Sequence, residues 1–203
     1  MLAFPERGIY REGKLDRYMH MRTIKLFIST AVLCFSLPGI SQSWKQHHSY
    51  PGMFSILAPE EMQTKTDTIK TALGGLVQHI SFYHDKRPDG ENNVYMVTWF
   101  DYPEGVMHHD STELVQALFD ETVEAAAFSV AGNVRWSSDI RYGPFPGRFW
   151  RVDYKDGRGV IKTKAWLVRN RYYAVQVVTR RDRALNYQAD KFMDSFRLMD
   201  QGR

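Results

Sequence analysis

Three consecutive residues, His108, His109 and Asp110, carry the side chains that are most typical of a metal site in this sequence. Neutral imidazole groups and a carboxylate are ordinary ligands of divalent ions. Adjacent side chains rarely point at one place, however, and the helical His-x-x-x-His spacing is missing. We therefore expect ordinary loop histidines, with Asp110 as the cap of the helix that follows. A metal-dependent hydrolase centred on these three residues is retained as the alternative.

Other arrangements that could support catalysis are weaker. No serine stands in the Gly-x-Ser-x-Gly turn that activates a hydrolase nucleophile. The acid pairs Glu60-Glu61 and Asp120-Glu121 are neighbours along the chain, so their carboxylates point in different directions. Such pairs suit a solvated surface better than general acid–base catalysis. The sequence leaves an enzyme open, but it favours a binding protein that uses no cofactor.

Five basic residues form a candidate partner-binding surface. Lys162 and Lys164 alternate with apolar or neutral residues, which places both lysines on one face of a strand. Arg180, Arg181 and Arg183 form a basic loop before the last predicted helix. Together these groups could bind an acidic partner protein or a phosphate-rich envelope surface. The simpler interpretation is that they are solvated surface charges.

Residues 21–41 have the order of a secretion signal, although they lie inside the chain. Two early positive charges precede an apolar run over 26–37, and a Pro-Gly pair and small residues follow it. The apolar run is roughly a dozen residues, whereas a membrane span needs about 20. We therefore predict that 1–20 is an upstream extension, that 21–41 is a cleavable signal peptide, and that the mature protein is periplasmic or secreted without a transmembrane segment.

Cleavage of the signal would change the composition of the chain. The single cysteine, Cys34, lies in the apolar run, so a mature chain over 42–203 has no thiol and no disulfide. Removal of residues 1–41 also takes six of the 27 Lys and Arg residues and three of the 23 Asp and Glu residues, which leaves a net charge of +1. That balance argues against a nucleic-acid-binding protein. The remaining length suits one domain.

The two halves of the mature chain differ in charge. Residues 42–132 hold 5 basic and 13 acidic residues, whereas 133–203 hold 16 basic and 7 acidic residues. The difference could produce an acidic face and a basic face. Our preferred interpretation is that strands from the two halves interleave and mix the charges.

Aromatic residues are frequent on the predicted strands. Most must form the core, because the mature chain has no disulfide to stabilise it. Some could line a binding surface for a peptide or a glycan. A cleft between the sheet and a helix could also hold a small molecule, and this possibility stays open.

Short apolar or alternating runs separated by turn signals indicate an α+β protein. The expected strands cover 53–57, 63–71, 76–84 and 93–100, then 134–142, 147–154, 160–168 and 172–180. A helix is expected from Asp110 to Gly132 and another over 187–198. Short turns require antiparallel pairing, and each helix should cover a sheet face. Positive φ angles are expected at Asp156-Gly157 and at Asn170.

Three short motifs and the central helix resemble the PsbP-like superfamily. The motifs are Phe54-Ser-Ile-Leu-Ala-Pro59, Pro146-Gly-Arg-Phe149 and Lys191-Phe-Met-Asp-Ser-Phe196. The resemblance implies an α/β/α sandwich with an antiparallel sheet in the order ββββ-α-ββββ-α. It transfers no catalytic residue, because this superfamily is chiefly known for binding and assembly. We therefore expect an exported, non-enzymatic binding or assembly factor whose partner is an envelope protein or an acidic surface.

Overall fold

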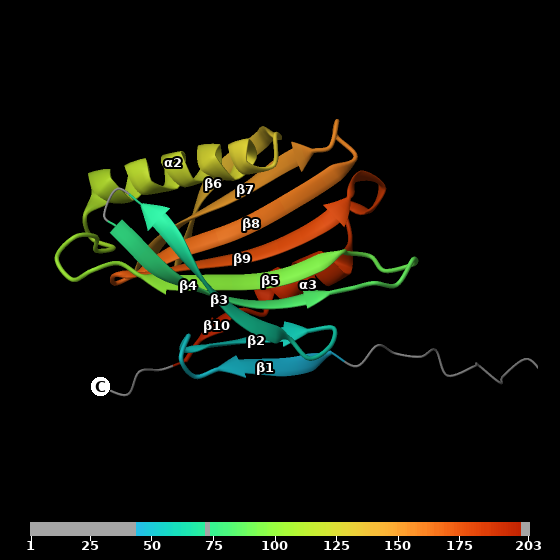
Figure 1. Cartoon of the computed structure of the whole chain (residues 1–203), viewed down its shortest axis with the longest axis horizontal. Helices are drawn as coiled ribbons and strands as arrows, with labels where there is room; N and C mark the ends of the chain where they lie inside the picture. The colour runs from blue at the N-terminus through green and yellow to red at the C-terminus, as the bar shows by residue number, and fades with distance from the viewer. Residues whose placement is uncertain (1–43, 72–73, 200–203) are drawn as a thin grey trace, which may run out of the picture. The chain divides into compact units, whose positions relative to one another are not determined.

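The computed structural model describes residues 44–71 and 74–199, and these residues belong to one compact unit (Figure 1). The predicted extension over 1–20 and the predicted signal over 21–41 lie outside the described residues. Among the residues that are described, no helix is both long enough and apolar enough to cross a membrane.

The unit contains a seven-stranded sheet and a three-stranded sheet. The large sheet is antiparallel, with the strand order β3 (Gln63–Thr71), β4 (Gly74–His84), β5 (Val94–Asp101), β9 (Arg171–Arg180), β8 (Gly159–Val168), β7 (Phe145–Tyr154) and β6 (Asn133–Tyr142). The small sheet joins β1 (Lys45–Ser49), β2 (Phe54–Ala58) and β10 (Arg197–Leu198). The helices are α2 (Thr112–Ser129) and α3 (Tyr187–Asp194), and a 3₁₀ turn, η2 (Arg181–Arg183), precedes α3.

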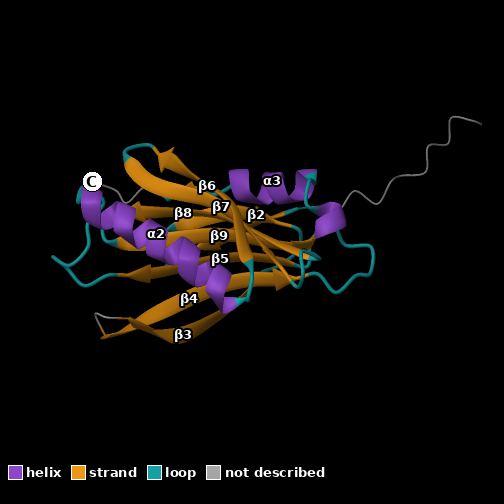
Figure 2. Cartoon of the chain, turned by 90° about the horizontal axis from the view of Figure 1, so that it is seen from above, coloured by secondary structure: helices purple, strands orange, loops and turns teal. Residues whose placement is uncertain are grey.

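Each helix packs on a different face of the large sheet, because α2 and α3 belong to separate core clusters. Figure 2 shows α2 lying across the strands of this sheet. Successive residues of a strand point to opposite faces, and β9 shows this directly. Tyr172 packs in the cluster that contains Val115 and Phe119 of α2. Tyr173 packs in the other cluster, with Phe192 of α3 and residues of the small sheet. The expected α+β class, with an antiparallel sheet between helices, is confirmed.

The order of the elements is confirmed only in part, because β1 and β10 were not expected. β1 is polar and rich in histidine, so it lacks the alternation that identifies a strand. The final helix ends at Asp194 rather than continuing to residue 198. The hydroxyl of Ser195 donates to the carbonyl of Phe192 at 2.8 Å and accepts from the backbone N–H of Leu57 at 2.9 Å. These bonds stop the helix and direct the chain into β10 beside β2.

The prediction that strands of the acidic half and the basic half interleave is wrong. Strands β3, β4 and β5 of the acidic half lie on one side of the large sheet, and β6 to β9 of the basic half lie on the other. The halves meet within this sheet at the β5–β9 pair. Instead, α2 crosses over: its charged residues are all acidic, and it packs on β6 and β7. Arg148 of β7 pairs with Asp120 of this helix at 3.0 Å.

Candidate functional site

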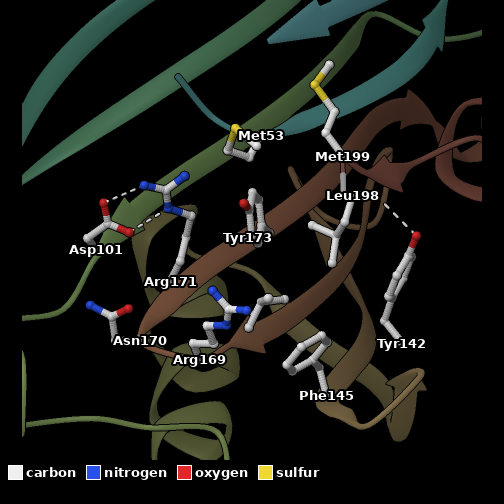
Figure 3. A pocket seen from close by; sticks show the side chains of 11 residues that line it. Met53, Asp101, Tyr142, Phe145, Arg169, Asn170, Arg171, Tyr173, Leu198 and Met199 are labelled. Carbon is white, nitrogen blue, oxygen red and sulfur yellow. Dashed lines mark hydrogen bonds and ion pairs between the residues drawn. The ribbon is translucent and has the colours of Figure 1, made fainter. Parts of the chain in front are cut away.

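A cavity of about 530 Å³ lies where five segments of the chain converge. These segments are the residue before β2, the end of β5, the β6–β7 turn, the β8–β9 turn, and β10 (Figure 3). The lining residues are Met53, Asp101, Tyr142, Phe145, Val168, Arg169, Asn170, Arg171, Tyr173, Leu198 and Met199. The cavity therefore depends on both sheets being joined correctly.

The apolar wall of the cavity comes from the β6–β7 turn and the small sheet. The ring of Tyr142 lies edge-on to Phe196 at 6.2 Å, and its hydroxyl accepts a hydrogen bond from the backbone N–H of Leu198 at 3.2 Å. The backbone N–H of Met199 donates to the carbonyl of Met53 at 2.8 Å. These contacts hold the aromatic and methionine side chains around one opening.

Arg171 supplies a fixed positive charge to the opposite wall. Its guanidinium donates to the two oxygens of Asp101 at 2.5 and 2.7 Å, and it also donates to the carbonyl of Pro51 at 3.1 Å. The guanidinium lies 4.7 Å from the ring centre of Trp99, a cation–π distance. The hydrogen bonds to Asp101 raise the pKa of Arg171 further above its ordinary value. Arg171 is therefore charged and immobilised.

Arg169 enters the same cavity from a strained turn (Figure 3). Its φ angle of 58° lies in the left-handed region, which side chains other than glycine adopt at a cost. The prediction of a positive φ angle at Asn170 is thus wrong, because the residue with a positive φ in this turn is Arg169. Asn170 is held instead by two bonds to Tyr102: its amide donates to the carbonyl at 2.8 Å, and its own carbonyl accepts the backbone N–H at 2.9 Å.

The three candidate metal ligands do not converge. Nδ1 of His108 lies 2.6 Å from the carboxylate of Asp110, and this hydrogen bond lowers the pKa of Asp110. The ring of His109 instead meets Phe145 edge-on at 5.0 Å, and partial burial lowers the pKa of His109. Within residues 44–71 and 74–199, no group of three or more His, Cys, Asp or Glu residues could hold a metal ion.

The expected role of Asp110 as a helix cap is wrong. The N-cap of α2 is Ser111, and its side chain makes no capping hydrogen bond. One oxygen of the Asp110 carboxylate instead lies 2.6 Å from Nδ1 of His108. The loop of His108 and His109 nevertheless lies beside the cavity, because the backbone N–H of His109 donates to the carbonyl of Arg169 at 2.9 Å.

The predicted lysines of the partner-binding surface are occupied or buried. Lys164 pairs with Asp194 of α3 at 2.5 Å and lies 5.1 Å from the ring centre of Phe149. Lys162 is only 7% exposed. Both lysines are on one strand face, as predicted, but this face is covered by α3 near Lys164.

The arginines of the basic loop also have partners within the chain. Arg180 pairs at 2.8 Å with Asp182, two positions further along the same loop. Arg183 donates to the backbone carbonyls of Asp89 and Gly90 in the β4–β5 turn. Arg181 extends toward Asp153 of β7, at 3.5 Å. The role of this loop in partner binding stays a prediction.

Sequence reasoning missed the cavity itself. The basic turn Arg169-Asn170-Arg171 between two strands is a signal that could have been followed. The contributions of Met53, Leu198 and Met199 depend on the small sheet, which the sequence pattern does not indicate.

No family model and no curated protein matches this sequence. Among solved structures, the chain is similar to the solution structure of cyanobacterial PsbP (CyanoP) from Synechocystis sp. PCC 6803. The TM-score is 0.50 at 10% sequence identity, over 82% of this chain and 99% of that chain. The chain has a PsbP-like fold. The resemblance inferred from short motifs is thereby confirmed for the fold, and at this identity no individual residue can be carried over.

Proposed function

We propose that this protein is an exported, non-enzymatic binding or assembly factor of the cell envelope. Its cavity between the β6–β7 turn, the β8–β9 turn and β10 would hold an acidic segment of a protein partner. The signal-like order of residues 21–41 supports export. The PsbP-like fold supports a binding role only by analogy, because one fold hosts many functions.

The observation that carries the proposal is the chemistry of the cavity walls. The guanidinium groups of Arg169 and Arg171 both line the cavity, beside the carboxylate of Asp101. Guanidinium groups bind carboxylates through two parallel hydrogen bonds. The facing wall includes Met53 and Met199, whose flexible side chains adapt to different apolar groups. An acidic residue next to an apolar residue in a partner would satisfy both walls.

Catalysis at this place is not supported by the lining residues. All of them belong to the described part of the chain, and they include no serine, cysteine, lysine or histidine. Asp101 is the one carboxylate among them, and both of its oxygens accept from Arg171. The two tyrosine hydroxyls of the lining contact backbone groups: Tyr142 accepts from the N–H of Leu198, and Tyr173 donates to the carbonyl of Gly52.

Site-directed photo-crosslinking in the source organism tests the proposal. A photoreactive amino acid in place of Phe145 should crosslink a discrete envelope protein, because Phe145 lines the cavity. The same group in place of Phe128, which is 88% exposed on α2, is the matched control and should not crosslink that protein. Equal crosslinking at both positions, or no crosslinking of any protein at Phe145, would overturn the proposal. A small molecule that stays bound to the purified protein in native mass spectrometry would favour a small-molecule binding module instead.

A further inference from the structure

Asp153 of β7 is the centre of a second charged cluster, away from the cavity described above. Its side chain is 6% exposed, and three arginines reach it: Arg151 at 2.6 Å, Arg135 at 3.2 Å and Arg181 at 3.5 Å. Lys162 lies directly across from Arg151 in the β7–β8 register, so both side chains are on the same face. One carboxylate therefore faces an excess of positive charge.

The neighbouring acids do not remove this excess. Asp156, in the β7–β8 turn, is 96% exposed and lies 3.8 Å from Arg158. Asp182, in η2, pairs with Arg180 at 2.8 Å. Each of these carboxylates has its own arginine. Asp153 is thus the acid that lies closest to all three arginines of the cluster.

A β-bulge positions one of the three arginines. The pairing of β6 with β7 shifts between Val134 and Trp136, so Arg135 is the extra residue. Bulges redirect a side chain that strict alternation would place elsewhere. Here Arg135 reaches Oδ2 of Asp153, the same oxygen that Arg181 approaches from η2. Two elements far apart in the sequence thus bring guanidinium groups to one point.

A cavity of about 250 Å³ opens against this point. Its charged lining consists of two arginines, Arg135 and Arg181, and two carboxylates, Asp153 and the exposed Asp156. The excess positive charge of the cluster therefore comes from Arg151 and Lys162, which lie next to the cavity lining. Arg135 and Arg181 are 53% and 57% exposed, so their remaining N–H groups can reach a ligand from solvent. Pockets for drug-sized ligands usually measure about 300–1,000 Å³, so the smaller volume suits a compact group.

We propose that the Arg135–Arg151–Arg181 cluster on Asp153 binds a phosphate group, either as free phosphate or as a lipid headgroup. Asp153 holds Arg151 with a short bond and orients Arg135 and Arg181 through longer contacts. Guanidinium groups match phosphate oxygens with paired N–H donors, and a bound anion would offset the excess charge. The site is independent of the proposed partner cavity.

Titration calorimetry with inorganic phosphate, on the purified protein at constant ionic strength, tests the proposal. Arg135→Gln and Arg181→Gln should each weaken phosphate binding at least 10-fold. The control is Arg180→Gln, a neighbouring exposed arginine that pairs with Asp182, and it should leave binding unchanged. Thermal unfolding of each variant verifies the fold. The proposal would be overturned if phosphate did not bind, or if chloride displaced it as well as phosphate itself does. Equal weakening of phosphate binding by Arg180→Gln and Arg181→Gln would also overturn it.

Vesicle co-sedimentation separates the two sources of phosphate. Retention on phosphatidylglycerol vesicles but not on phosphatidylcholine vesicles, reversed by inorganic phosphate and lost in Arg181→Gln, would assign a lipid headgroup. Phosphate binding without vesicle retention would assign the free anion. Vesicle retention that Arg135→Gln and Arg181→Gln leave intact would contradict the site.

Discussion

Asp85 is a charged residue whose side chain is 1% exposed, and its contacts explain why the fold tolerates it. Its carboxylate accepts from the backbone N–H of Arg87 at 3.0 Å and from the guanidinium of the same residue at 2.8 and 2.6 Å. These bonds lower the pKa of Asp85 below its ordinary value. Gly90 completes the turn, because a Cβ atom there would lie 2.7 Å from the carboxylate.

We predict that Asp85→Asn destabilises the protein by about 1–3 kcal/mol at pH 7, the usual cost of disrupting a buried charge-assisted hydrogen bond. The folded pKa is lowered, so the contribution of Asp85 is complete above the unfolded value, near 3.9, and is lost as pH falls through the folded value. Urea unfolding at neutral and acidic pH measures this. The control is Asp182→Asn, an exposed carboxylate that pairs with Arg180 on the surface and whose loss should have little effect. If the difference in unfolding free energy between wild type and Asp85→Asn does not shrink in acid, the stabilising role of the ionised Asp85 carboxylate is contradicted.

At the scale of elements, β7 approaches β8 closely at Gly147. A Cβ atom at this position would overlap the carbonyl oxygen of Ala165 and the indole ring of Trp166. Trp166 in turn stacks on Phe196 at 5.3 Å, in the core beneath the small sheet. The glycine of the Pro146-Gly-Arg-Phe149 motif is thus explained by packing. Any side chain here would separate β7 from β8.

We predict that Gly147→Ala lowers the free energy of unfolding by on the order of 2 kcal/mol, the typical cost of overpacking a core. Gly75→Ala is the control, because a Cβ there meets one methyl group, of Thr68, at 3.2 Å on the outer β3–β4 pair. Chemical denaturation of both variants makes the comparison. Equal stability of the two variants would show that the close approach of β7 to β8 at Gly147 does not affect the free energy of unfolding.

The strands of the large sheet were predictable because their alternation and their turn residues are local signals. Asp156 and Gly157 have the expected positive φ angles, at 55° and 79°. β1 and β10 were not predictable, since a polar five-residue strand and a two-residue strand owe their existence to pairing with β2. The cavity required that pairing as well. The basic loop was visible as charge, but the contact of Arg183 with the β4–β5 turn spans 94 positions in the sequence.

At the scale of the whole molecule, the charge asymmetry survives in the sheet and is partly neutralised across it. Acidic α2 lies over basic β6 and β7, while the partner cavity and the Asp153 cluster both draw their arginines from residues 133–203. Arginines of this half therefore contribute to two separate cavities. Each cavity has its own proposed ligand, an acidic protein segment and a phosphate group.

Export of the protein would determine where the chain begins and what net charge it carries. We predict that the protein recovered from the envelope or the medium begins near Gln42, because the signal order ends at residue 41. N-terminal sequencing and intact mass measure this directly. Replacing two apolar residues of 26–37 by arginine should block export and leave the precursor in the cytoplasm. Recovery of a product that retains Met1 would contradict export and the charge balance derived from it.

The cavity lined by Arg169 and Arg171 is proposed to bind an acidic segment of a partner protein. The most direct measurement is a charge exchange on the partner identified by crosslinking at Phe145. Arg169→Glu should weaken partner binding at least 10-fold in protein whose cooperative thermal unfolding verifies the fold, and a lysine in place of the partner's acidic residue should restore binding to this variant alone. Undiminished binding by Arg169→Glu, or a lysine exchange that does not restore binding, would show that the acidic segment does not bind in this cavity.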